Sequence, residues 1–266
     1  MKGDNALRYG IRDGCLNEPW EKLFAVAHRL GFDGVELDIG GDFRQSMWWT
    51  ADGMARLRSA IQQSGAELAS VCLGAYWGIS PASRDPQVRA AARELAIGSL
   101  RRCRDLGARW ILAPITPAQD VPHEEARQRW IEEMRACAPV AEETEVYLAL
   151  ENVGAGSAQS ASDLLAIVEG VGSPYVKAYY DPGNGLSLGN DPVAEILLLG
   201  AERIVEIHAK DPGGELLGEG KLDWDAVAAA IKQIGYSGYV VLETPRTSDP
   251  ERAARHNLAF LRERLG

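Results

Sequence analysis

Histidine and cysteine are scarce in this chain, and long apolar runs are absent. Its 266 residues include four histidines and four cysteines, and no two cysteines form a C-x-x-C pair. Reduced thiols are therefore expected rather than a disulfide framework. No apolar run reaches the length that spans a bilayer, and the first residues show no secretory leader pattern. We expect a cytoplasmic protein with no membrane partner.

Positive charge is also in deficit. Lys and Arg number 28 against 38 Asp and Glu, which gives a formal net charge of −10. Because unspecific binding to nucleic acid needs a basic surface, no nucleic-acid partner is expected. The remaining composition is ordinary for a globular protein, with 46% hydrophobic and 25% charged residues. That is enough apolar side chain for a large core.

One junction recurs along the chain, where a helix-like stretch ends at a glycine and an apolar, β-rich run follows. It occurs at Gly31, Gly65, Gly107, Gly200 and Gly235. Glycine is favoured just past a helix end because it adopts the left-handed conformation without a Cβ clash. Helix starts are marked by an Asp that caps the helix and a Pro in its first turn. These pairs are Asp85-Pro86, Asp191-Pro192 and Asp249-Pro250, and Asn17 is expected to cap the first helix.

Strands and helices alternate throughout. The pattern predicts strands at residues 7–13, 34–39, 67–73, 109–115, 146–152, 176–181, 204–210 and 239–244. Helices are predicted at residues 18–30, 52–64, 86–106, 122–142, 161–170, 192–199, 223–234 and 250–265.

Such alternation requires a parallel sheet, and eight units of this length most economically close into a barrel. We therefore predict an α/β fold, a (β/α)8 TIM barrel that forms a single domain over residues 1–266. The rival is a doubly wound open sheet. It would usually show a phosphate-binding glycine fingerprint after an early strand, and Arg12-Asp13-Gly14-Cys15 follows the first strand instead.

Four predicted strands end in a carboxylate or an imidazole. Glu151, Asp181, His208 and Glu243 each follow a run of buried-type residues, at separations of 30, 27 and 35 residues. In a closed barrel, consecutive strand ends are neighbours around a ring, so the four side chains are expected to converge. Catalytic residues of such barrels lie at this C-terminal end.

Three converging carboxylates would repel one another unless a cation lay between them. A mostly oxygen donor set with one imidazole suits Mn²⁺ or Mg²⁺, with Co²⁺ or Zn²⁺ as alternatives. Each residue alone has a simpler interpretation, since Asp181 before Pro182 could cap a helix and a lone histidine is usually structural. Their joint placement at the same end of successive strands favours one divalent metal ion.

The motifs in their order resemble the xylose-isomerase-like TIM-barrel superfamily, and within it the tagatose 3-epimerase-like sugar phosphate isomerases and epimerases. The likeness covers nearly the whole chain and rests on residues 31–37, 150–152, 181–184, 208–211, 217–224 and 242–245. It implies that Glu151, Asp181, His208 and Glu243 bind one divalent metal. It also implies that Glu151 and Glu243 act as acid and base on opposite faces of a ketose, through a metal-bound enediolate.

Two positions depart from the tagatose 3-epimerase pattern. Asn184 stands where that pattern has a histidine, and Gly214 stands where it has an arginine. Free-ketose specificity is therefore not implied, and a broader branch remains open that includes pentulose-phosphate epimerases, inosose isomerases and dehydratases.

Further residues are candidates for substrate binding. Glu36 is predicted as a substrate contact, with an ion pair behind the site as the alternative, and Lys210 as a contact to a substrate oxygen, with a salt bridge to a strand-end carboxylate as the alternative. Asn184 is a predicted hydrogen-bond donor to substrate or to a ligand. Glu206, deeper in the same strand as Lys210, is predicted to be buried and paired.

Aromatic pairs occur in two loops after strands, at Trp48-Trp49 and Tyr76-Trp77. Sugar faces pack on aromatic rings, so Trp77 is predicted to bind substrate. The alternative is an apolar lid or a subunit contact, and a homo-oligomer remains open.

The leading functional hypothesis is a metal-dependent isomerase or epimerase of a sugar or sugar phosphate. The alternative is a lyase or dehydratase on the same scaffold, of the dehydroshikimate dehydratase or oxidised-glycoside-cleaving kind, in which proton abstraction is followed by loss of a leaving group. The endonuclease branch of the superfamily needs a three-metal, histidine-rich cluster and a basic face. Four histidines and a net charge of −10 argue against it.

Overall fold

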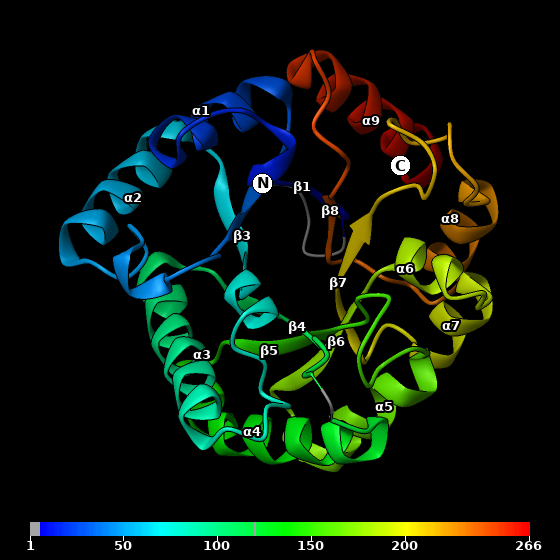
Figure 1. Ribbon diagram of the computed structural model, residues 1–266. Helices are drawn as coiled ribbons and strands as arrows, with labels where there is room; N and C mark the ends of the chain where they lie inside the picture. Colours follow the sequence, from blue (N-terminus) through cyan, green and yellow to red (C-terminus); the bar gives the residue numbers. More distant parts are fainter. Residues whose placement is uncertain (1–5, 120) are drawn as a thin grey trace.

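A computed structural model describes residues 6–119 and 121–266 of the protein. Its strands form one closed barrel in which every strand is parallel to the strands before and after it in sequence. Figure 1 shows the barrel at the centre, with the helices as an outer ring around it. The predicted (β/α)8 barrel is confirmed.

The strands are short, and the helices between them vary in length. The strands are β1 Arg8–Arg12, β2 Gly34–Asp38, β3 Glu67–Cys72, β4 Trp110–Pro114, β5 Tyr147–Glu151, β6 Val176–Tyr180, β7 Ile204–Ala209 and β8 Tyr239–Leu242. The helices are α1 Trp20–Leu30, α2 Ala51–Ser64, α3 Pro86–Leu106, α4 His123–Thr144, α5 Ala161–Val171, α6 Pro182–Ser187, α7 Pro192–Leu199, α8 Trp224–Gln233 and α9 Pro250–Leu265. Short 3-10 turns follow the first three strands, at Asp13–Cys15, Phe43–Gln45 and Gly74–Trp77.

The predicted helix boundaries have a clear physical basis, with two exceptions. The five glycines after helices all have positive φ, and the three Asp-Pro aspartates each accept a hydrogen bond from a first-turn N–H. The prediction that Asn17 caps the first helix is wrong, because α1 begins at Trp20 and Pro19 holds the cap position without a side-chain bond. Helix α6 was not predicted, since its two glycines are poor helix formers.

Apolar side chains fill both the barrel and the layer between barrel and helices. Inside the barrel, a cluster packs around the rings of Tyr179 and Tyr239 and includes Cys72, which is buried as predicted. A larger core joins the outer faces of the strands to the helices. None of the described helices is long and apolar enough to cross a membrane.

The strand register brings the polar strand ends to one rim. Glu151 pairs with Tyr179 across β5 and β6, and His208 pairs with Val241 across β7 and β8. Each of these positions lies at or within one residue of its strand's C-terminal end. The fold therefore places the candidate residues at the end of the barrel where active sites of this architecture lie.

Glu206 is buried inside the barrel below this rim, as predicted. No hydrogen bond of good geometry reaches either of its carboxyl oxygens among the described residues. Burial and the nearby Glu36 hold the pKa of Glu206 well above its ordinary value, and Ser70 and Arg8 lower its pKa only in part. Since the unfolded chain loses this proton near pH 4.3, the group costs stability increasingly as pH rises above that value.

Glu206→Met should therefore stabilise the protein at pH 8, because it removes a buried carboxyl whose oxygens accept no hydrogen bond of good geometry among the described residues. The expected gain is about 1–3 kcal/mol, seen as a rise of several degrees in Tm, and it should shrink toward pH 4. Thermal unfolding across this pH range measures it, with exposed Glu143→Met as the control. A lower Tm at pH 8 would show that the folded protein does provide Glu206 with a partner.

Candidate active site

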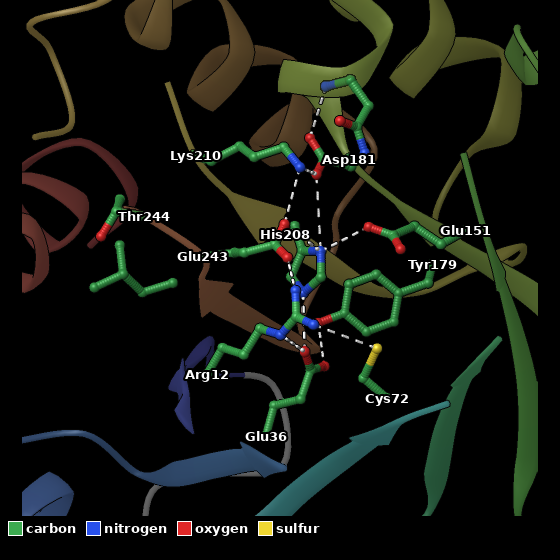
Figure 2. A network of polar contacts seen from close by, with 12 residues as sticks. Arg12, Glu36, Cys72, Glu151, Tyr179, Asp181, His208, Lys210, Glu243 and Thr244 are labelled. Atoms are coloured by element: carbon green, nitrogen blue, oxygen red, sulfur yellow. Dashed lines mark hydrogen bonds and ion pairs between the residues drawn. The ribbon is translucent and has the colours of Figure 1, made fainter. Parts of the chain in front are cut away.

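The four residues predicted to form a ring do meet. Glu151 is the last residue of β5, Asp181 follows β6, His208 lies in β7, and Glu243 follows β8. Each offers one ligand atom, and these atoms all lie within 4.8 Å of one another. Figure 2 shows the side chains turned toward a common point at the barrel mouth.

His208 Nδ1 is the centre of this group. It lies 2.8 Å from Glu151 Oε1, 3.3 Å from Glu243 Oε2 and 3.7 Å from Asp181 Oδ2. The imidazole is fully buried. One ring nitrogen therefore faces three carboxylates, each supplied by a different strand.

The other ring nitrogen, His208 Nε2, faces Glu36 Oε1 at 3.1 Å. Ser70 and Tyr179 donate hydrogen bonds to Glu36 Oε2 at 2.7 and 3.0 Å. Burial raises the pKa of Glu36, but His208, Arg12 and Ser70 outweigh it and hold the pKa below its ordinary value. Glu36 is thus a buried carboxylate that fixes the orientation of the imidazole, an arrangement common behind metal-binding histidines.

The charges around His208 favour its protonated form in the absence of another cation. Burial lowers the pKa of His208, but Glu36 and Glu151 raise it to about 9. Both ring nitrogens then act as donors to carboxylates. The site attracts positive charge.

Asp181 combines two roles. Its Oδ1 accepts a hydrogen bond from Asn184 N and so caps α6, while its Oδ2 faces His208. This second oxygen is buried and accepts no hydrogen bond of good geometry among the described residues, although Lys210 Nζ lies 2.7 Å away. Asn152 bonds both the N–H and the carbonyl of Asp181 at 2.9 Å, which fixes the backbone from which the carboxylate extends.

Two long cationic side chains complete the group. Lys210 Nζ donates to Glu243 Oε2 at 2.9 Å. Arg12 Nη1 donates to the other oxygen, Glu243 Oε1, and Arg12 Nη2 lies 3.0 Å from Asp38 Oδ2. Burial lowers the pKa of Lys210, but Asp181 and Glu151 raise it above its ordinary value, so the ammonium stays charged.

A cavity of about 480 Å³ opens above this group. Arg12, Asp38, Lys210 and Glu243 line its inner end, and the loops after β7 and β8 form its outer wall. A volume of this size suits a small molecule.

The other predicted substrate contacts are placed differently. Glu36 is fully buried behind His208. The side chain of Asn184 donates to Asn152 O at 2.7 Å. Neither Glu36 nor Asn184 lines the cavity. Trp77 lies on the turn after β3 with 59% of its surface exposed. Its neighbour Tyr76 is buried.

The sequence pattern did not identify Arg12 as a member of the site, and it predicted for Asp38 only that it faces the barrel mouth beside Glu36. Arg12 ends β1 and Asp38 ends β2, at the same rim as the predicted ring. The signal was present, since both are polar residues that directly follow apolar strand positions. For Arg12, however, no local pattern indicates that its side chain reaches the end of β8.

The residues present fit a divalent cation. Ions such as Mn²⁺, Mg²⁺ and Zn²⁺ hold nitrogen and oxygen ligands at about 2.0–2.2 Å, so ligand atoms grouped around one such ion lie within about 4–5 Å of one another. The four candidate ligand atoms satisfy that spacing. The buried Asp181 Oδ2, which forms an ion pair with Lys210 but accepts no hydrogen bond of good geometry among the described residues, and the Glu36 carboxylate behind His208 both suit such an ion.

Comparison with known proteins agrees with this geometry. A family model described as "Xylose isomerase-like TIM barrel" matches residues 24–264. The chain is 32% identical over 247 residues to an Escherichia coli K12 protein named "Putative L-ribulose-5-phosphate 3-epimerase SgbU", which covers 87% of this chain and 86% of that protein. It is 30% identical over 244 residues to L-ribulose-5-phosphate 3-epimerase UlaE of Salmonella paratyphi C, and this match covers 88% of this chain and 86% of that protein.

Solved structures share the fold. A D-allulose 3-epimerase from Methylomonas sp., solved with D-allulose, superposes with a TM-score of 0.85 at 21% identity and covers 98% of both chains. The IOLI protein, solved with a bound zinc atom, gives a TM-score of 0.79 at 17% identity and covers 97% of this chain and 98% of that one. The matched family model and the relatives of at least 30% identity show that the chain belongs to the xylose isomerase-like TIM barrel family, and both of those relatives carry the name L-ribulose-5-phosphate 3-epimerase.

Proposed function

We propose that this protein is a divalent-metal-dependent epimerase of a ketose or a ketose phosphate. The observation that carries the proposal is the convergence of three carboxylates on the Nδ1 atom of one buried imidazole. The names of the relatives, which are L-ribulose-5-phosphate 3-epimerases, support the reaction class. They also favour a five-carbon substrate with a phosphate group.

Glu151, Asp181, His208 and Glu243 would hold the ion. When bound, a divalent ion draws electron density from two adjacent oxygens of a ketose and so acidifies the hydrogen on the neighbouring carbon. The oxygen-rich donor set favours Mn²⁺ or Mg²⁺, although a zinc-bound relative of this fold exists.

The two glutamates supply the proton transfers. One carboxylate removes the proton from one face of the carbon, and the electron pair stays on the substrate as an enediolate. The other carboxylate returns a proton to the opposite face, which inverts the carbon. Glu151 ends β5 and Glu243 follows β8, so their carboxylates reach the site from different strands of the barrel.

The remaining predicted contacts have supporting roles. Lys210 lines the cavity and its ammonium can stabilise negative charge on substrate oxygens. Glu36 orients His208 from behind. Asn184 and the exposed ring of Trp77 are proposed to contact substrate, since both follow strands at the catalytic rim.

Wild-type protein loaded with Mn²⁺ should epimerise a ketose in deuterated water and incorporate deuterium at the carbon that inverts. The substrate panel is D-allulose, D-tagatose, L-ribulose and L-ribulose 5-phosphate, followed by NMR and mass spectrometry. Glu151→Gln keeps the size of the side chain but cannot accept a proton. It should slow interconversion by about 10²–10⁴-fold while thermal unfolding stays unchanged.

Three outcomes would contradict the proposal. Wild-type protein that binds metal but exchanges no carbon-bound hydrogen across the panel would exclude an epimerase of these ketoses. Wild-type turnover in Glu151→Gln would exclude Glu151 from proton transfer. A product with strong ultraviolet absorbance would indicate loss of a leaving group, and hence a lyase.

Metal binding should strengthen as pH rises. Because the pKa of His208 is raised to about 9 in the metal-free protein, an ion must displace a proton from Nδ1. Mn²⁺ affinity should increase by about tenfold per pH unit between pH 6.5 and 9 and then level off. Titration of the metal-free protein with Mn²⁺, followed by electron paramagnetic resonance, measures this slope.

His208→Ala is the matched control for that titration. It should bind Mn²⁺ much more weakly and without the steep dependence on pH. If wild-type affinity did not change with pH, or if His208→Ala behaved like wild type, His208 would not be a ligand.

A further inference from the structure

Arg12 lies among the carboxylates of the site, although neither the predicted ring nor the proposed proton transfers assign it a role. Its side chain is 22% exposed and reaches from the end of β1 toward the end of β8. Figure 2 shows the guanidinium beside Glu243, with Glu36 and Cys72 on its other sides. Arg12 Nη1 donates to Glu243 Oε1.

The guanidinium is held from behind. Arg12 Nη2 lies 3.0 Å from Asp38 Oδ2 and 3.7 Å from Cys72 Sγ, and Arg12 Nε lies 3.8 Å from Glu36 Oε1. Asp38 is itself closely packed, because a Cβ at Gly74 would come within 2.0 Å of its Oδ1. The planar arginine fork is thus fixed at several points before it meets Glu243.

This contact makes the two glutamates unequal. Glu243 uses Oε1 for Arg12, and its Oε2 lies 3.3 Å from His208 Nδ1 and 2.9 Å from Lys210 Nζ. Glu151 uses Oε1 for His208 Nδ1, and in the described part of the chain its Oε2 receives no hydrogen bond. Arg12, which is not one of the four candidate metal ligands, therefore helps to fix the orientation of Glu243. No such residue fixes the orientation of Glu151 in the described part of the chain.

We propose that Arg12 is the positioning residue of Glu243, holding one carboxylate oxygen so that the other faces His208 and the reacting carbon. This inference rests on the proposed epimerase function and deepens it. Arg12 acts through Glu243 and leaves the proton transfer on the Glu151 side intact. We therefore expect the proton transfer by Glu243 to depend on Arg12 much more than the proton transfer by Glu151.

The difference can be observed because each half-reaction exchanges hydrogen by itself. When one carboxylate takes a proton from carbon, the carbon–hydrogen bond breaks and its electron pair remains on the substrate. That carboxylate can then exchange its proton with deuterated water and return a deuteron to the same face. The starting epimer is recovered with deuterium at that carbon, without any inversion.

The experiment measures deuterium incorporation separately for the two epimers of the ketose that wild-type protein interconverts best in the panel. The variants are Arg12→Gln, Glu243→Gln and Glu151→Gln, all loaded with Mn²⁺. In Arg12→Gln the rate of interconversion should fall by about 100-fold or more, but one epimer should still incorporate deuterium. The same epimer should incorporate deuterium in Glu243→Gln and should not do so in Glu151→Gln.

Three controls separate positioning from other roles. Arg12→Lys should restore part of the activity, because an ammonium pairs with a carboxylate without the arginine fork. Arg8→Gln changes an arginine at the other end of the same strand, paired with Glu67 at 3.1 Å, and should leave both exchange rates unchanged. Titration with Mn²⁺ alone gives the concentration that saturates each variant, so that all exchange rates are compared with the ion bound.

The outcomes are distinct. Equal loss of exchange in both epimers, or unchanged interconversion, in Mn²⁺-saturated Arg12→Gln would each overturn the assignment of Arg12 while leaving the epimerase function standing. A rise in KM with unchanged kcat would also overturn it, because Arg12 would then bind substrate. If wild-type protein exchanged no hydrogen with any ketose in the panel, the proposed function itself would fail, and the role of Arg12 with it.

Discussion

Repulsion among carboxylates at the barrel mouth is the constraint on which this site depends. Glu151, Asp181 and Glu243 all approach His208 Nδ1, and Glu36 approaches the opposite nitrogen. Charges this close and this deeply buried repel strongly in a medium less polar than water. Their arrangement is stable only when positive charge is placed among them.

The chain supplies positive charge both at the outer carboxylates and at the centre of the site. Arg12 and Lys210 enter from β1 and β7 and pair with the outer carboxylates. The buried imidazole, with its pKa raised to about 9, supplies a charge at the centre. A divalent ion would replace the central proton and bring more positive charge than it displaces. The same geometry is the basis of both the proposed metal site and the proposed proton transfers.

Much of this could be predicted from the chain, because strand ends obey simple rules. Glu151, Asp181, His208 and Glu243 follow apolar runs at regular spacing, and closure of the barrel brings them together. The contact between Arg12 and Glu243 could not be predicted, since the residues are 231 positions apart and meet only because β1 pairs with β8. Local patterns also failed to show that Trp48 and Tyr76 are buried in the core and that Trp77 alone of its pair is exposed.

The proposed site requires four strand ends to hold one divalent ion. Anomalous X-ray diffraction from crystals grown with Mn²⁺ tests it directly. We predict a single strong peak, about 2.0–2.3 Å from His208 Nδ1 and from one oxygen each of Glu151, Asp181 and Glu243. A well-ordered site without a peak, or a peak bound elsewhere, would contradict it.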